Sequence, residues 1–352
     1  VRVTDVSTQA HPLTDCFLEA TEQIGISKNP DYNTGNIEGS FVYQTNTHKG
    51  LRSSAANAYL SPIKKQKNLV IITRALVKKI LFEGARAVGV EYSHKGSPKV
   101  VHATKEIIIS AGALGSPQLL QISGIGPAEK LKNLNIKVLS DLPDVGLHLK
   151  DHIGLDHTLL TNQPSLNQVL RPLSGKIKVA LQYLFFRNGP LSMSLNQGGG
   201  FVKSDPTLDV PDLQLYFSPL SYSTAPYGRR PLMMPDPYPA VRLGFSLCKP
   251  TSEGSISIQS ADSSVPPKLF GNYLSTRYDQ QTMISGMKLM RKLAATEALK
   301  KIVHTEMSPG KDVKSDAELL EYARLHGETV FHQCGTCRMG DNPANSVVDG
   351  KL

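Results

Sequence analysis

The order of apolar and polar positions predicts a helix at the start of the chain. Phe17, Thr21 and Ile24 recur at helical spacing and therefore share one face. Thr14 lies before this stripe as an N-cap residue, and Gly25 follows it as a helix terminator. We therefore expect the first helix between these two residues.

The period then shortens and predicts a meander of β-strands. A short helix is expected at residues 52–60, ending at Ser61-Pro62, because a residue before proline disfavours helical backbone. After it, β-branched runs alternate with polar turns, and Glu83-Gly84 has the composition of a hairpin turn. The predicted strands are residues 69–73, 76–82, 87–92 and 99–102.

A strand, a loop of small residues and a helix are predicted around residue 110. Residues 106–110 form a near-continuous apolar run, which is typical of a strand buried on both faces of a parallel sheet. Residues 111–115 form the loop, and Ser116-Pro117 then supply an N-cap and a first-turn proline for a helix at residues 118–122. Amide groups at such a helix start can face a phosphate or a cofactor ring. The pattern fits an ordinary strand-to-helix turn equally well.

The second half of the chain predicts an antiparallel sheet and several helices. Asp279 opens a long helix whose Met283, Met287 and Met290 share one face, as expected for core packing. Ser315 and Glu318 form a capping box at the start of another helix. A helix is also expected at residues 177–186, strands at 213–217, 241–247 and 255–259, and proline-rich surface loops at 219–239.

Composition excludes several classes of protein. With 352 residues, 40% of them hydrophobic, the chain is long enough for two domains with a sizeable core. No apolar run approaches the roughly 18 residues of a membrane-spanning helix. The formal net charge is +9, but the densest basic run, Lys64-Lys65-Gln66-Lys67, contains no aromatic residue. We therefore interpret it as a solvated face and expect no nucleic-acid partner.

One histidine stands out as a candidate catalyst. His332 precedes a loop rich in glycine, cysteine and threonine, where a general base can act near neutral pH. Cys334 and Cys337 in the same loop form a C-x-x-C pattern, which allows a redox pair or, together with His326, a zinc site. Neither context fits well, because no helix follows the pattern and the separated ligand pairs of a structural zinc site are absent.

Several motifs resemble the glucose-methanol-choline (GMC) oxidoreductases, which are FAD flavoproteins. Residues 112–126, GALGSPQLLQISGIG, match a signature of that family position for position, and residues 332–340 resemble its H-x-x-G-T-C-x-M-G segment. The other matching stretches follow the family's order and are residues 52–60, 145–152, 250–256 and 272–274. The general character of the sequence suggests the insect glucose-dehydrogenase-like branch of that family.

The resemblance implies an α/β fold (α+β overall): a partial FAD-binding Rossmann-like domain plus a substrate domain with an antiparallel β-sheet. The implied boundaries are residues 1–155 for the N-terminal segment, 156–248 for the substrate region and 249–352 for the C-terminal segment. It implies hydride transfer from an alcohol or sugar carbon to the flavin, with His332 accepting the hydroxyl proton and oxygen or a quinone accepting the electrons. The implied cofactor-binding residues are Val77, Ser110, Ala111, Gly112 and Phe331, with no metal site.

The sequence also departs from the family pattern at several positions, and these departures lead to further predictions. The G-x-G-x-x-G fingerprint is absent, and residues 347–352 resemble the beginning of the family's closing segment. We therefore expect an internal fragment, inactive by itself, of an active enzyme. His148 occupies a position where the family usually has Asn. The rival hypothesis is a non-catalytic binding protein that retains the fold. The residues do not indicate the cellular compartment of the protein, and secretion is suggested only by the family resemblance.

Overall fold

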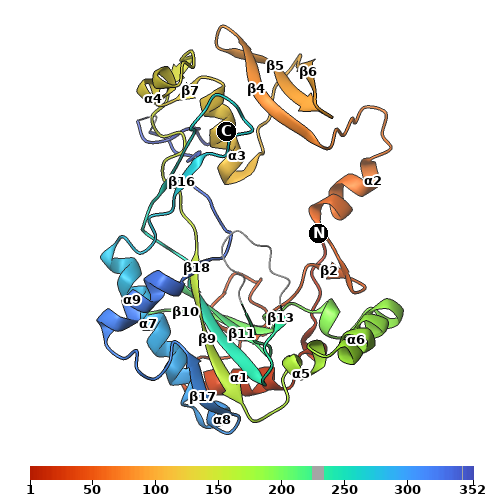
Figure 1. Ribbon diagram of the computed structural model, residues 1–352, viewed down its shortest axis with the longest axis vertical. Helices are drawn as coiled ribbons and strands as arrows, with labels where there is room; N and C mark the ends of the chain where they lie inside the picture. The colour runs from red at the N-terminus through yellow and green to blue at the C-terminus, as the bar shows by residue number, and fades with distance from the viewer. Residues whose placement is uncertain (224–233, 343) are drawn as a thin grey trace. The chain divides into compact units, whose positions relative to one another are not determined.

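The computed structural model describes residues 1–223, 234–342 and 344–352 and divides into two compact units (Figure 1). Unit 1 comprises Val1–Leu69, Ile153–Lys249 and Gln280–Glu328. Unit 2 comprises Val70–His152, Pro250–Asp279 and Thr329–Leu352. Each unit therefore assembles segments that are far apart in the sequence. The three-part division predicted from the motifs stays a prediction.

An antiparallel sheet forms the centre of unit 1. Its strand order is β1-β10-β11-β14-β9-β17, and β18 also pairs with β9. Consecutive members of this order run antiparallel. The strands are β1 (Gly39–Val42), β9 (Ile153–Thr161), β10 (Gly198–Val202), β11 (Leu213–Ser218), β14 (Ala240–Leu247), β17 (Val303–Ser308) and β18 (Glu328–Thr329).

One face of this sheet carries the hydrophobic core of unit 1. Leu215 lies opposite Phe245 in the ladder, and Phe217 lies two residues further along the same face. The Phe217 ring stacks on Phe17 of α1 (Leu13–Gln23) at 5.1 Å between centroids. The Phe245 ring lies against Gly286 of α7 (Arg277–Ala294), where a larger side chain would collide with it. Helices α1 and α7 therefore cover this face, and the predicted methionine stripe of α7 is buried there.

The opposite face of the sheet is polar. The Tyr43 hydroxyl donates to the Leu215 carbonyl at 2.7 Å and accepts from Gln214 Nε2 at 2.9 Å. Tyr216 Oη and Ser246 Oγ are 2.9 Å apart. Burial raises the pKa of Tyr216 to about 12, so its hydroxyl stays protonated in this network. The alternation of apolar and polar residues along β11 thus separates a packed face from a hydrogen-bonding face.

Shorter elements surround the sheet of unit 1. The capping box predicted at Ser315 is present, and it starts α9 (Asp316–His326). The others are η1 (Ser7–Gln9), β2 (Thr47–His48), β3 (Leu51–Arg52), η2 (Ala56–Leu60), α2 (Ser61–Ile63), α5 (Leu166–Leu170), α6 (Leu173–Phe186), η3 (Pro190–Ser192), β12 (Tyr222–Ser223), β13 (Met234–Pro235) and α8 (Glu297–Lys300).

Unit 2 contains the predicted meander and the helix of the small-residue motif. The meander has the order β4-β5-β6, and Gly84 makes its first turn with φ +59°. The elements are β4 (Ala75–Glu83), β5 (Arg86–His94), β6 (Ser97–His102), α3 (Gly112–Ile122), β7 (Ile125–Gly126), α4 (Ala128–Asn133), β8 (Ser140–Asp141), β15 (Ser255–Ser257) and β16 (Lys268–Phe270).

Two of the predicted strands do not form in the described chain. Residues 69–73 and 106–110 have no strand partner, and their apolar side chains are largely exposed, with Val70 at 80% and Ile108 at 78%. A strand forms only when its amide and carbonyl groups meet a neighbouring strand, which neither run has here. The prediction of a strand buried on both faces at residues 106–110 was therefore wrong for this structure.

Three further predictions need correction. The helical segment after Arg52 starts only at Ala56 and ends at Leu60, and a separate helix, α2, follows at Ser61–Ile63. Pro62 lies in the first turn of α2, where a proline needs no amide partner. Helix α3 starts at Gly112, six residues before the predicted start. The stretch 219–239 is not entirely a surface loop, since Leu220 and Ser221 are buried. Residues 224–233 of that stretch lie outside the described residues.

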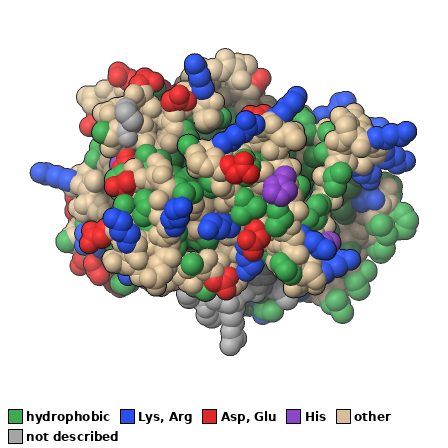
Figure 2. Space-filling model, turned by 90° about the horizontal axis from the view of Figure 1, so that it is seen from above, with side chains coloured by type: hydrophobic (Ala, Val, Ile, Leu, Met, Phe, Trp, Pro, Cys, Tyr) green, Lys and Arg blue, Asp and Glu red, His purple; other side chains and the backbone are tan. Residues whose placement is uncertain are grey.

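Within the described residues, no helix has the length and apolar character that crossing a membrane requires. On the face drawn in Figure 2, Lys and Arg side chains are scattered among acidic and apolar ones.

Candidate cofactor and catalytic site

The turn from Ser110 to Gly112 leads directly into α3 within unit 2. All three residues of this turn are exposed. Gly112 has φ +78°, a conformation that favours glycine, and no heavy atom lies within 4 Å of the position that a Cβ would take. The Ala111 amide donates to Ser116 Oγ at 3.2 Å, and among the described residues no side chain caps the start of α3. The predicted segment 110–112 is therefore exposed backbone that leads into a helix N-terminus, where amides can face a cofactor.

A proline inside α3 ties this helix to the loop of His332. Pro117 has no amide hydrogen, so the carbonyl of Ala113, four residues earlier, has no partner within the helix. The Thr336 hydroxyl donates to that carbonyl at 2.6 Å. Thr336 is buried, and its own carbonyl accepts from the Gly146 amide at 2.9 Å. The two motifs that carried the family resemblance are thus joined by a hydrogen bond.

Asp151 anchors the segment that carries His332. The carboxylate is 6% exposed and accepts from the Thr329 hydroxyl, from Tyr273 Oη at 2.6 Å and from Gln333 Nε2 at 3.0 Å. It also accepts from the backbone amide of His332 at 2.9 Å. Burial and the neighbouring carboxylate raise the pKa of Tyr273 to about 12, so this donor stays protonated. Three donors from residues 329–333, together with Tyr273, therefore surround one buried carboxylate and fix that segment.

His332 is exposed beside a second histidine. Its Nδ1 lies 3.3 Å from Nδ1 of His152, and the two rings meet edge to face at 5.2 Å between centroids. A hydrogen bond between them requires one Nδ1 to carry the proton and the other to accept it. When His332 Nδ1 is the donor, Nε2 of the same ring is free to accept a proton. Phe331 adopts φ +61° and is 79% exposed. The turn thus presents both predicted residues outward.

The two cysteines of the loop differ in exposure. Cys334 is exposed, whereas burial raises the pKa of Cys337 to about 11, which disfavours a thiolate there. Both are free thiols. Within residues 1–223, 234–342 and 344–352, no group of three or more His, Cys, Asp or Glu side chains could hold a metal ion. The zinc and redox hypotheses therefore gain no support.

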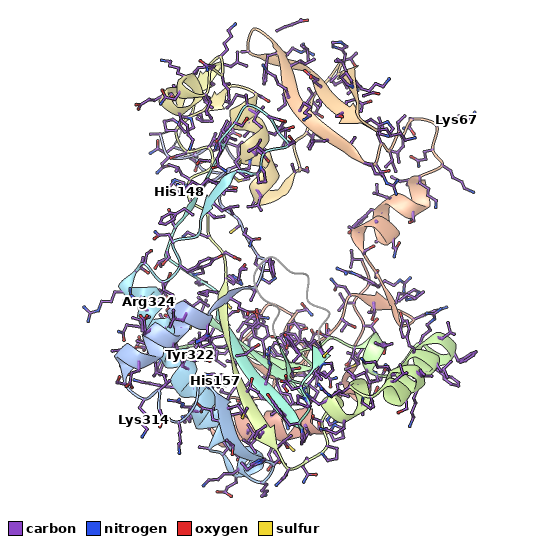
Figure 3. The ribbon with its side chains drawn as sticks, viewed as in Figure 1. Lys67, His148, His157, Lys314, Tyr322 and Arg324 are labelled. Atoms are coloured by element: carbon purple, nitrogen blue, oxygen red, sulfur yellow. The ribbon has the colours of Figure 1, made fainter. Side chains whose placement is uncertain are left out.

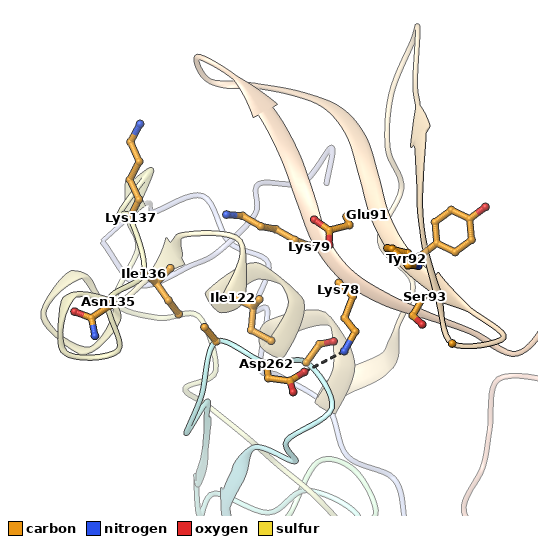
Figure 4. A pocket seen from close by; sticks show the side chains of 14 residues that line it. Lys78, Lys79, Glu91, Tyr92, Ser93, Ile122, Asn135, Ile136, Lys137 and Asp262 are labelled. Carbon is orange, nitrogen blue, oxygen red and sulfur yellow. Dashed lines mark hydrogen bonds and ion pairs between the residues drawn. The ribbon is translucent and has the colours of Figure 1, made fainter.

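Val77 lies on β4, opposite Tyr92 of β5, and precedes a bulge. The adjacent Lys78 forms an ion pair with Asp262 at 3.0 Å. Lys78 and Asp262 line an open cavity of about 730 Å³ in unit 2 (Figure 4). None of the predicted site residues lines that cavity. Strand β4 is nevertheless tied to the end of α3, because the Ile80 amide donates to Ser123 Oγ at 3.0 Å.

His148, which stands where the family resemblance leads us to expect asparagine, lies in a tight turn. It has φ +58°, a left-handed conformation in which Asn and His are both enriched. Its Nδ1 lies 2.6 Å from Glu253 Oε2, and this hydrogen bond lowers the pKa of the Glu253 carboxyl. Gly335 of the His332 loop packs against the His148 carbonyl, where a side chain would collide. The turn at His148 thus has a backbone conformation that asparagine also favours.

Sequence reasoning missed the residues that hold this site together. Asp151 appeared only as part of a matching stretch, and neither Thr329 nor Tyr273 was assigned a role. One signal was available, because an Asp beside His152 in a turn-rich segment needs donors if it is buried. Which donors reach it depends on folding that joins residues more than a hundred positions apart.

Comparisons with known proteins match this geometry to one family. A GMC oxidoreductase model matches residues 1–154, and a second GMC oxidoreductase model matches residues 250–352. An oxygen-dependent choline dehydrogenase from Staphylococcus saprophyticus is 37% identical and aligns with 96% of this chain and 60% of its own length. An alcohol dehydrogenase [acceptor] from Pseudomonas putida is 38% identical over 96% of this chain and 61% of its own.

A solved FAD-dependent oxidoreductase from Chaetomium thermophilum superimposes with a TM-score of 0.85 at 22% identity. It covers 96% of this chain, which in turn covers 64% of that one. The predicted mixed α/β fold with antiparallel sheets is confirmed.

The chain belongs to the GMC oxidoreductase family. It spans about 60% of the length of the choline and alcohol dehydrogenases that it matches. FAD, the predicted cofactor, is confirmed at the level of the family. The individual site residues stay predictions.

Proposed function

We propose that this chain is part of a FAD-dependent enzyme that oxidises the CH–OH group of a small alcohol, with His332 as the general base. The observation that carries the proposal is the turn anchored by Asp151. It presents His332 and Phe331 outward and is hydrogen-bonded through Thr336 to the helix that starts at Gly112. When bound, FAD supplies the acceptor for the hydride that leaves the alcohol carbon.

Different residues of unit 2 would contact different parts of the cofactor. Ser110, Ala111 and Gly112 would hold the cofactor through exposed backbone at the start of α3, and Val77 would contact its adenine end. Phe331 would lie beside the flavin.

His332 would take the hydroxyl proton at Nε2 in the tautomer whose Nδ1–H donates to His152, since Nε2 is then unprotonated. An alkoxide releases hydride more readily than an alcohol, so a base within hydrogen-bond reach lowers the barrier.

The donor and the electron acceptor are proposed at the level of chemical class. The Staphylococcus and Pseudomonas relatives have names of choline and alcohol dehydrogenases, which favours an alcohol over a sugar. The insect glucose-dehydrogenase-like branch stays a prediction. One relative is named oxygen-dependent and another carries the word acceptor, so oxygen and a quinone are both proposed acceptors.

We also propose that stable FAD binding needs more of the protein than these 352 residues. The exposed apolar runs at residues 69–73 and 106–110 support this, because apolar runs of that composition normally lie inside a sheet. The chain alone is then expected to hold FAD weakly and to show no turnover.

Flavin absorbance tests the proposal on two proteins purified in parallel, the 352-residue chain and a version extended at both ends from the source transcript. We expect the extended protein to retain flavin that choline, a primary aliphatic alcohol or glucose bleaches under anaerobic conditions. His332→Ala should retain flavin and lose the bleaching, whereas His102→Ala, an exposed histidine on β6, should bleach normally. Flavin in neither protein would support the binding-protein hypothesis instead.

A further inference from the structure

Helix α6 exposes an unusually large apolar surface. Leu173, Ile177, Leu181, Leu184 and Phe185 are each between 48% and 73% exposed. Their spacing of three or four residues, continued by Phe185, places them on one side of the helix as a continuous ridge. We call these five side chains the α6 ridge. Figure 1 shows α6 beside α5 and apart from the strands of the unit 1 sheet. An exposed apolar surface of this kind normally marks an interaction site.

The opposite side of α6 fastens it to unit 1. Val179 is buried, and the Tyr183 hydroxyl donates to the Gly50 carbonyl at 2.9 Å. Arg187 ends the helix in a left-handed conformation, and its guanidinium lies over the Tyr183 ring at 5.2 Å. The orientation of α6 is therefore fixed by contacts that leave the ridge pointing away from its own unit.

The charged residues of α6 and of the sequence on either side of it all have one sign. No Asp or Glu occurs between Asn162 and Ser204. Lys176 and Lys178 flank the ridge on its two sides, because each lies one position away from Ile177 around the helix. Neither forms an ion pair within the part of the chain that the structure describes. The surface therefore combines an apolar ridge with unneutralised positive charge.

We propose that α6 docks the protein on the surface of an anionic lipid bilayer. An apolar ridge bordered by lysines matches the acyl boundary and the negative headgroups of such a surface, as in helices that lie in the plane of a membrane. With 14 residues, about 21 Å long, the helix is too short to span a bilayer. This inference does not depend on the proposed enzymatic function.

Co-sedimentation with vesicles tests the proposal on the 352-residue chain and on the extended protein. We expect both to bind vesicles of phosphatidylcholine with 30% phosphatidylserine and to bind pure phosphatidylcholine vesicles much more weakly. Leu181→Gln/Phe185→Gln should lower the partition coefficient by at least about tenfold. Lys176→Gln/Lys178→Gln should lower it roughly fivefold per lysine at low salt, with little effect in pure phosphatidylcholine. Leu269→Gln/Phe270→Gln, on exposed β16, is the matched control and should bind like the unchanged protein.

A fluorescent reporter keeps the test decisive if a glutamine variant fails to fold. The chain contains no tryptophan, so Phe185→Trp introduces a single probe. Its emission should shift to the blue with anionic vesicles and be quenched by brominated lipid, whereas Phe270→Trp should not respond.

The proposal is overturned if vesicles bind only the shorter chain, if the ridge variant binds normally, or if Phe185→Trp does not respond. It is equally overturned if the ridge variant abolishes a dimer in sedimentation velocity without affecting lipid binding, because the ridge would then contact a second copy.

Discussion

Strand β11 of the unit 1 sheet and the apolar runs at residues 69–73 and 106–110 are both rich in large apolar residues but have opposite environments. Leu213, Leu215 and Phe217 of β11 are 0% exposed, whereas the two runs are largely exposed and form no strand. The difference lies in their neighbours, because β11 has a strand on each side and two helices over one face. Apolar composition indicates the capacity to form a buried strand, and pairing decides the outcome.

The largest expected effect is a difference in stability between substitutions in these two regions. Phe217→Ala should lower the free energy of unfolding by about 3–5 kcal/mol, because it leaves a cavity beside Phe17. Ile108→Ala, at a 78% exposed position, should change it by no more than about 0.5 kcal/mol. Urea denaturation of the 352-residue chain measures both. If Ile108→Ala costs as much as Phe217→Ala, residues 106–110 are buried in solution and the comparison fails.

A pH effect should come from the core of unit 1. His157 on β9 is 1% exposed, and burial lowers its pKa to about 4, although Glu306 partly offsets this (Figure 3). The unfolded chain binds this proton below its normal pKa of about 6.5, whereas the folded chain does not until about pH 4. Stability should therefore be fully present above pH 6.5 and fall by roughly 3 kcal/mol as the pH drops to about 4.

Stability measured as a function of pH in the His157→Phe variant checks this assignment. Its stability should lose most of the slope between pH 6.5 and 4, whereas His304→Phe, at an exposed position on β17, should keep it. An unchanged slope in His157→Phe would assign the acid sensitivity to other groups.

The smallest of the stability effects tests the hydrogen bond between the Thr336 hydroxyl and the Ala113 carbonyl in the candidate site. Thr336→Val should cost about 1–2 kcal/mol, because it leaves the Ala113 carbonyl without a donor. In a Pro117→Ala background the amide of residue 117 can satisfy that carbonyl, so the same substitution should cost much less. Denaturation of the four proteins gives the coupling energy. Equal costs in both backgrounds would show that the hydrogen bond does not compensate for the proline.

Much of the fold could be predicted from the sequence where the pattern reflects local chemistry. The capping box at Ser315, the methionine face of α7 and the hairpin turn at Gly84 depend on neighbouring residues and were predicted correctly. The start of α3 was predicted incorrectly, because the sequence Ser116-Pro117 resembles a helix start. Pro117 instead lies inside the helix, where the hydroxyl of Thr336, more than two hundred residues away in the sequence, hydrogen-bonds the carbonyl that the proline leaves without a partner.

Motifs predicted the candidate site residues, but they did not predict the residues that hold the site in place. Motif position indicated His332 and Gly112, and the structure links their two segments through one hydrogen bond. Asp151 was missed as an anchor, since a carboxylate becomes a structural centre only when folding brings donors such as Tyr273 to it. No local pattern encodes that arrangement.

Rapid mixing of the extended, flavin-loaded protein with an alcohol tests the central claim most directly. The account predicts that the alcohol reduces the flavin rapidly. His332→Ala should retain its flavin and reduce it more slowly by roughly 10²–10⁴-fold. Reduction of His332→Ala at the unchanged rate would contradict the assignment of His332 as the base.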